Sequence, residues 1–122
     1  MPFLHDDVFD NGLNVIDANV ENLYITNAEI SVFANLAAAT LGSKAAPTIS
    51  APGDRTGGGR KVTVSAITDG AVSANGTASH YALVDDSASK ILAAGPLNAS
   101  QVVTSGNVFT LTAFDVGIPD PS

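Results

Sequence analysis

The residue types best suited to metal chemistry lie near the start of this sequence. An imidazole and three carboxylates fall within six residues, namely those of His5, Asp6, Asp7 and Asp10. Oxygen-rich clusters of this kind can bind calcium, but the spacing does not match the Asp-x-Asp-x-Asp-Gly loop with a distal glutamate. We therefore expect no metal site here and interpret the acidic residues as a charged surface.

A second set of reactive residue types lies near residue 80. His80 could join Asp85 or Asp86 and a serine in a nucleophilic triad, but the Gly-x-Ser-x-Gly elbow that exposes such a serine is absent. Asp85 and Asp86 are neighbours, and adjacent strand residues face opposite ways, so they do not suit the carboxylate pair of a glycosidase. The sequence predicts a non-enzymatic protein without a cofactor.

Four glycines fall within seven residues between Gly53 and Gly59. A phosphate-binding loop needs a glycine, four residues and then Gly-Lys-Ser or Gly-Lys-Thr, followed by a helix. The lysine is missing at that place, and the next run, Lys61–Ile67, predicts a strand. We interpret the segment from Pro47 to Gly59 as a flexible tip between strands.

Composition excludes several classes of function. The 122 residues have a formal net charge of −7 and only 5 lysines and arginines, which argues against nucleic acid as a partner. The absence of cysteine excludes disulfide frameworks and thiolate metal sites, and fits a reducing cytoplasm. No apolar run reaches the ~18 to 20 residues of a membrane span. The acidic first ten residues lack the basic start of a signal peptide.

Alternating apolar and polar residues predict most of the chain as strand. Between Arg60 and Asp86, the runs Lys61–Ile67 and Ser79–Val84 flank a loop of Asp, Gly, Asn and Ser, and predict the first hairpin of an antiparallel sandwich. Other strands are predicted at Leu13–Ile16, Asn22–Thr26, Lys90–Ala94, Gln101–Thr104 and Val108–Phe114, with a break at Gly95-Pro96 and a tight turn at Thr104–Asn107.

One helix is expected, near residues 28–40. Thr26 and Glu29 have the spacing of a capping box, and Gly42 stands where a left-handed C-cap would end the helix. The apolar face would consist of Ile30, Phe33, Ala37 and Leu41.

The predicted fold is therefore mainly β, an antiparallel β-sandwich (immunoglobulin-like or jelly-roll-like) with one short helix and an extended N-terminal arm. We expect the arm at residues 1–12, a single sandwich domain at 13–116 and an extended tail at 117–122. Apolar and acidic residues mix in the arm, and no lysine or arginine precedes Lys44, so we expect the arm to dock on a partner. The predicted partner-binding residues are Phe3, Leu4, Asp6, Asp7, Val8, Phe9 and Asp10.

Four motifs carry a family resemblance. They are LYIT at Leu23–Thr26, SAITDG at Ser65–Gly70, TASHYALVD at Thr77–Asp85 and the closing VTSGNVFTLTAFDVGIPD. With the sequence around them, they resemble a family of small uncharacterised proteins of tailed bacteriophages and prophages of alphaproteobacteria. The resemblance implies a structural component of the virion, assembled in the host cytoplasm, and implies no catalytic residues.

We therefore expect a capsid decoration or cement protein attached to the major capsid lattice, present as a homo-oligomer on the particle. A neck or tail structural subunit is the first alternative. A carbohydrate-binding sandwich module is the second, although the chain has no tryptophan and Tyr24 and Tyr81 fall within predicted strands. The expected partners are other virion proteins, either the major capsid protein or neck and tail subunits, and neither nucleic acid nor a membrane.

Overall fold

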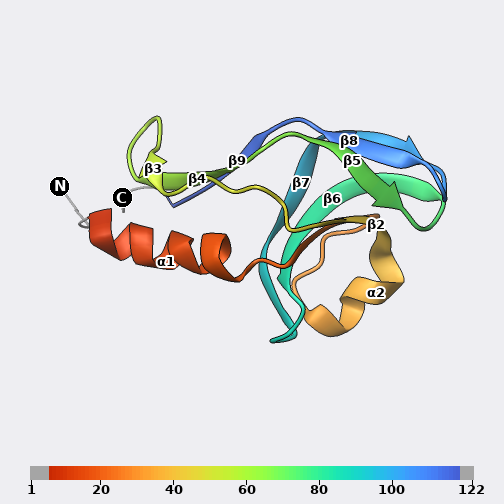
Figure 1. Cartoon of the computed structure of the whole chain (residues 1–122), viewed down its shortest axis with the longest axis horizontal. Helices are drawn as coiled ribbons and strands as arrows, with labels where there is room; N and C mark the ends of the chain where they lie inside the picture. The colour runs from red at the N-terminus through yellow and green to blue at the C-terminus, as the bar shows by residue number, and fades with distance from the viewer. Residues whose placement is uncertain (1–5, 119–122) are drawn as a thin grey trace.

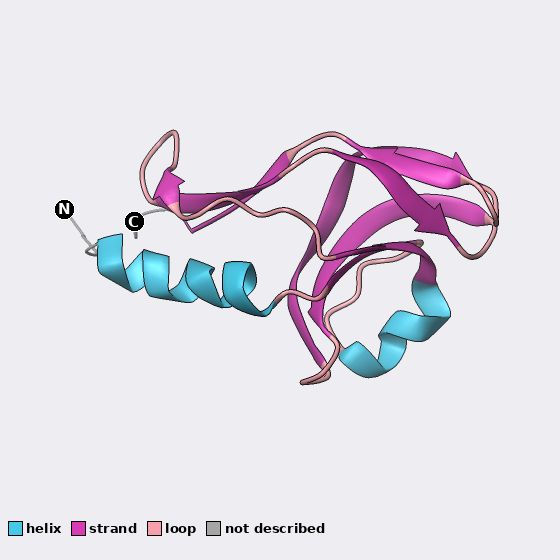
Figure 2. Cartoon of the chain, in the orientation of Figure 1, coloured by secondary structure: helices cyan, strands magenta, loops and turns pink. Residues whose placement is uncertain are grey.

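The structure is a computed structural model that describes residues 6–118, with side chains described from residue 11 onward. It is mainly β, and the predicted antiparallel, sandwich-like fold is confirmed (Figure 2). The helical elements are α1 (Asp6–Asn19), the 3-10 turn η1 (Phe33–Asn35) and α2 (Leu36–Ala39). The strands are β1 (Asn22–Thr26), β2 (Thr40–Ala45), β3 (Gly53–Asp54), β4 (Arg60–Val64), β5 (Ile67–Val72), β6 (Gly76–Asp85), β7 (Lys90–Val103), β8 (Val108–Leu111) and β9 (Phe114–Ile118).

The strands form two sheets. The main sheet has six strands in the order β7-β6-β1-β2-β5-β8, and the small sheet has three in the order β3-β4-β9. In Figure 1 the main sheet curls on the right, and the small sheet extends to the left above α1. β7 and β8 are the two edges of the main sheet.

One bent ribbon of two paired strands connects the sheets. β4 pairs with β9 as far as Val64 and Phe114, and pairing resumes between β5 and β8 at Ile67 and Leu111, three residues further along each strand. The two strand pairs therefore share one register. Residues 65–66 and 112–113 lie between them, and the ribbon bends there as it passes from the small sheet to the main sheet (Figure 1).

Aromatic rings that lie over glycines pack this curved structure. Phe109 is 1% exposed and pairs with Gly70, where an added β-carbon would lie only 2.1 to 2.5 Å from three atoms of the ring. Tyr81 covers its partner Gly95 on β7 in the same way, with the phenol oxygen 3.2 Å from where a β-carbon would be. Phe109 can lie this close to the neighbouring strand only because Gly70 has no side chain, whereas a β-carbon at Gly95 would need the Tyr81 ring to move by a few tenths of an ångström.

The helix α1 shows that two predictions were wrong, the extended arm over residues 6–12 and the strand at Leu13–Ile16. Leu13 and Ile16 are buried in the main core, where α1 packs against β4, while Val15 is 45% exposed. Two inward residues three positions apart define a helical face. The predicted strand rests on Leu13, Val15 and Ile16, and Val15 does not face the core.

The second helix is much shorter than the range predicted for it. Its regular part is the turn η1 and the four residues of α2. Thr26 ends β1 and its hydroxyl donates to the carbonyl of Ala28 at 2.7 Å, while Gly42 lies within β2. The ladder of β1 and β2 therefore takes both residues that were expected to cap the helix. Ile30 and Leu36 still pack together, in a second cluster with Val84 on the face of the main sheet opposite the main core.

The segment from Arg60 to Asp86 is not one hairpin, because β5 occupies the predicted loop. β4 pairs with β3 and β9, whereas β6 pairs with β1 and β7. Alternation located the strand residues correctly, but it carries no information about which strands pair.

Strand ends also differ from the prediction in the last third of the chain. Lys90–Ala94 and Gln101–Thr104 belong almost entirely to the single strand β7, and Val108–Phe114 is divided between β8 and β9. The tight turn is confirmed, because Asn107 donates to the carbonyl of Thr104 at 3.1 Å. β9 continues to Ile118, so the predicted tail begins within a strand, and residues 119–122 lie outside the described part.

Substitution of Gly70 tests the ring-on-glycine packing. We expect Gly70→Ala to lower the free energy of unfolding by about 1–3 kcal/mol, because the methyl group overlaps the ring of Phe109 in a filled core. Gly53→Ala is the matched control, since a β-carbon there meets nothing within 4 Å and its backbone needs no glycine. Urea unfolding of both variants checks this, and equal stability of the two would contradict it.

Candidate functional site

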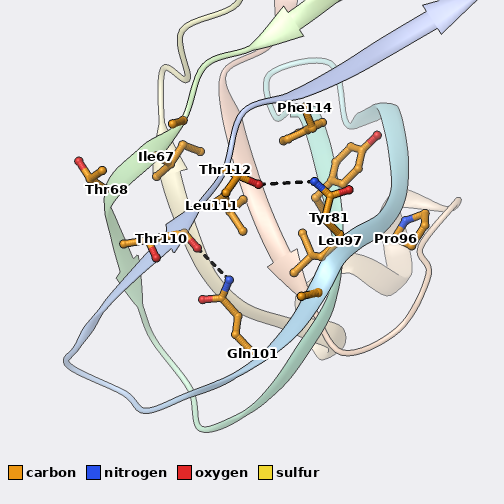
Figure 3. Close-up of a pocket in the computed structure, with 13 residues that line it drawn as sticks. Ile67, Thr68, Tyr81, Pro96, Leu97, Gln101, Thr110, Leu111, Thr112 and Phe114 are labelled. Carbon is orange, nitrogen blue, oxygen red and sulfur yellow. Dashed lines mark hydrogen bonds between the residues drawn. The ribbon is translucent and has the colours of Figure 1, made fainter.

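A groove opens where the bent ribbon passes the edge strand β7 (Figure 3). Its volume is about 530 Å³. One wall comes from the ribbon and consists of Ala66, Ile67, Thr68, Thr110, Leu111, Thr112 and Phe114. The other wall comes from β6 and β7 and consists of Tyr81, Pro96, Leu97, Asn98, Ala99 and Gln101.

The second wall exists because β7 leaves its partner strand there. Ala78 of β6 pairs with Gln101 and His80 pairs with Pro96, so residues 97–100 of β7 stand opposite Ser79 alone. This is a large β-bulge, and it turns part of β7 toward the ribbon. The predicted break in this region marks the start of the bulge, although the strand continues through it.

Side chains join the two edges of the main sheet across the groove. The Nε2 of Gln101 donates to the carbonyl of Thr110 at 2.8 Å, and the Nδ2 of Asn98 lies 3.5 Å from the Oγ1 of Thr112 (Figure 3). A backbone ladder would hold the strands about 4.8 Å apart, whereas here a whole side chain spans the gap. The main sheet is thus a barrel that is not closed by a ladder. We call these two contacts the seam.

The lining of the groove carries no charge. The rings of Tyr81 and Phe114 lie with their centroids 4.3 Å apart. Burial raises the pKa of the Tyr81 phenol, which is therefore neutral at physiological pH. The other lining side chains are aliphatic, aromatic, hydroxyl or amide groups. Such a lining offers no acid–base pair. It suits the binding of an uncharged, partly apolar group.

The predicted partner-binding residues that the structure describes lie away from the groove. Five of the predicted residues lie in the first turns of α1, namely Asp6, Asp7, Val8, Phe9 and Asp10. The other two, Phe3 and Leu4, lie outside the described residues. Figure 1 places the start of α1 at the left-hand end of the molecule, whereas β5 and β8 lie at the right. Their role in binding a partner stays a prediction, and the five described residues would present it from a helix and not from an extended arm.

The structure does not gather His80, Asp85 and Asp86 into one group. His80 lies within β6, as predicted, and the two aspartates lie at the end of that strand. Asp86 accepts from the phenol of Tyr24 at 3.1 Å and from the amide of Asn22. Among the described residues, no group of three or more His, Cys, Asp or Glu side chains could hold a metal ion.

The glycine-rich segment forms the turn between β3 and β4 and therefore lies at a tip between two strands. Arg55 donates its backbone N–H to the carbonyl of Gly59, and Gly58 donates to the carbonyl of Arg55, each at 3.1 Å. The next element is the strand β4, so the strand-to-helix geometry of a phosphate loop is absent from this place.

A polar network lies across β4 and β9. Asp115 accepts from the hydroxyl of Thr63 at 2.7 Å and from the ammonium of Lys61 at 3.0 Å. The hydrogen bond from Thr63, and then that from Lys61, lower the pKa of the Asp115 carboxyl below its usual value. Because these side chains are partly solvated, the network stabilises the small sheet only modestly.

Sequence reasoning missed the groove, although one signal was present. From Ile91 to Phe114 the chain has no Asp, Glu, Lys, Arg or His. That stretch contains most of β7, all of β8 and the turn between them. An uncharged run in an acidic chain marked both edges of the open barrel.

Comparison of the chain with protein-family models gives no match, and comparisons with curated proteins and with solved structures give none. Within residues 6–118, no helix is long and apolar enough to cross a membrane.

The pH dependence of the small sheet tests the Asp115 network. Since the folded pKa of Asp115 is depressed, its contribution to stability is present above the unfolded pKa and is lost as the pH falls through the folded pKa. We expect Thr63→Val to raise this folded pKa, so that the loss occurs at higher pH. Carboxyl-carbon NMR titration measures the pKa directly. Thr77→Val, an exposed strand position on β6, is the control, and an unchanged Asp115 pKa in Thr63→Val would refute the assignment.

Proposed function

We propose that this chain is a non-enzymatic structural protein of a bacteriophage virion, and specifically a decoration or cement protein on the major capsid lattice. The motif resemblance supports a place in the virion, and the open edges of the main sheet support a role in assembly. The uncharged groove supports binding rather than catalysis.

The observation that carries the proposal is the unclosed barrel. Edge strands pair with other chains unless they are protected, and this main sheet keeps both edges with only side chains between them. Val102 and Val108 flank the turn that joins the edges and are 83% and 66% exposed. Exposed apolar residues beside open edges suit a protein–protein contact.

A neck or tail subunit would use the same edges, and it remains the first alternative. The carbohydrate-binding alternative is favoured by a separate pocket of about 350 Å³ beside α2. Its lining includes the rings of Tyr24 and Phe33 and the carboxylate of Asp86, the groups that sugars use for stacking and hydrogen bonding. Glycan-array binding that is lost in Phe33→Ala would favour this alternative.

The copy number in purified particles tests the proposal. A decoration protein should be present in on the order of hundreds of copies, because it follows the symmetry of the capsid lattice. Quantitative mass spectrometry against the major capsid protein measures this ratio. A single small ring of copies would move the assignment to the neck or tail, and absence from the particle would contradict a virion role.

The acidic start of α1 gives a second test. We expect the triple variant Asp6→Asn, Asp7→Asn and Asp10→Asn to attach to particles at least tenfold less tightly at low salt, if these carboxylates face a basic surface of the partner. The control removes three acids elsewhere, with Asp17→Asn, Glu29→Gln and Asp69→Asn. Circular dichroism checks that α1 survives, since acids at a helix N-terminus also stabilise the helix. Equal loss in both variants would show that only net charge matters.

A further inference from the structure

The edge of β8 that faces the seam presents backbone groups to the groove. β8 has a partner strand, β5, on one side only. The carbonyl of Thr110 points into the seam, since it accepts from Gln101. Its N–H points to the same side, because a strand residue directs both backbone groups together. Val108, two residues earlier, repeats this orientation.

The two edges of the barrel are protected unequally. Natural proteins protect sheet edges with charges, prolines and bulges. β7 carries Lys90, Pro96 and the bulge at residues 97–100. β8 has the sequence Val-Phe-Thr-Leu and none of these features, and the amide of Gln101 bonds to its exposed carbonyl. β8 is therefore the edge that remains able to pair.

The geometry points to a strand-acceptor site on β8. This inference rests on the proposed function and names the kind of partner, an extended segment of another virion protein whose central residues carry no charge. A backbone N–H of the segment replaces the amide of Gln101 at the carbonyl of Thr110. Every second side chain of the segment then enters the groove beside Leu97 and Phe114.

Charge complementarity selects this occupant. Since no lining residue is charged, a charged side chain in the groove would lose its hydration without gaining a counter-charge. The chain as a whole carries −7, which attracts basic residues just outside the groove. The segment is therefore apolar and threonine- or serine-like in its centre, and basic at its ends.

The first experiment measures binding of a synthetic peptide to the isolated protein. The probe is an acetylated and amidated heptapeptide in which valine or leucine alternates with threonine between two terminal lysines. We expect saturable binding by calorimetry, with NMR shifts at Thr110, Gln101 and Leu97. Absence of binding at millimolar peptide would overturn the inference.

N-methylation of the peptide separates strand pairing from simple apolar binding. Only alternate N–H groups of an added strand face the edge that it pairs with. Methylation of one alternate set should weaken binding at least tenfold, while methylation of the other set should change it little. Equal effects of the two sets would show that no ladder forms and would overturn the inference.

Gln101→Ala gives a test from the protein side. The variant removes the group that competes for the Thr110 carbonyl, so the peptide should bind about fivefold more tightly, which is the effect of one ordinary hydrogen bond. Asn27→Ala is the matched control, because this exposed residue lies between β1 and η1 and lines neither wall of the groove. Weaker binding to Gln101→Ala would contradict the displacement.

The same experiments would detect two other occupants of the groove, a second copy of this chain and a small molecule. Concentration-dependent self-association that protects β8 would identify a second copy as the occupant and would overturn the partner assignment. Binding of an apolar dye in the groove without any peptide binding would do the same in favour of a small molecule. Because particles are absent from these assays, peptide binding by a protein that is missing from virions would refute the proposed function alone.

Discussion

The close packing of the main sheet depends on large rings that lie directly on glycines of the neighbouring strand. Phe109 lies over Gly70 at one flank, closer than any side chain at Gly70 would allow, and Tyr81 lies over Gly95 at the other, where a β-carbon would be tight against the ring. The ribbon can then bend between the sheets without losing its register. The same Tyr81 ring contacts Phe114 beside the groove, so this packing also shapes the open side of the sheet.

The open side is unusual in being left to side chains. A backbone ladder between β7 and β8 would bury both edges. The seam has instead only two side-chain contacts, from Gln101 to Thr110 and from Asn98 to Thr112. One hydrogen bond contributes on the order of 1 kcal/mol to stability, so the seam is weak compared with the core beneath it. Because the seam is weak and the core is stable, a backbone group of an incoming strand can replace the Gln101 side chain at Thr110 while the fold stays intact.

The sequence predicted the fold class and most strand positions, because alternation reports directly on a half-buried strand. It did not predict α1, since Leu13 and Ile16 were combined with the exposed Val15 in a short pattern that fits two periods. It overestimated the second helix because Thr26 has a cap-like sequence but is held in β1 by pairing with β2 and β6. The groove could not be derived from local patterns, because its walls come from β5, β6, β7, β8 and β9, and only pairing places these strands together. The uncharged run from Ile91 to Phe114 was the one local signal of it.

We propose that this chain joins a larger assembly through the edge of β8. Hydrogen–deuterium exchange compared between the isolated protein and the protein on purified particles tests it most directly. We expect the amides of β8, Thr110 above all, to exchange much more slowly on the particle. The exchange of the amides of β3 and of the glycine turn should change little. Protection confined to other elements, with β8 exchanging equally in both states, would contradict it.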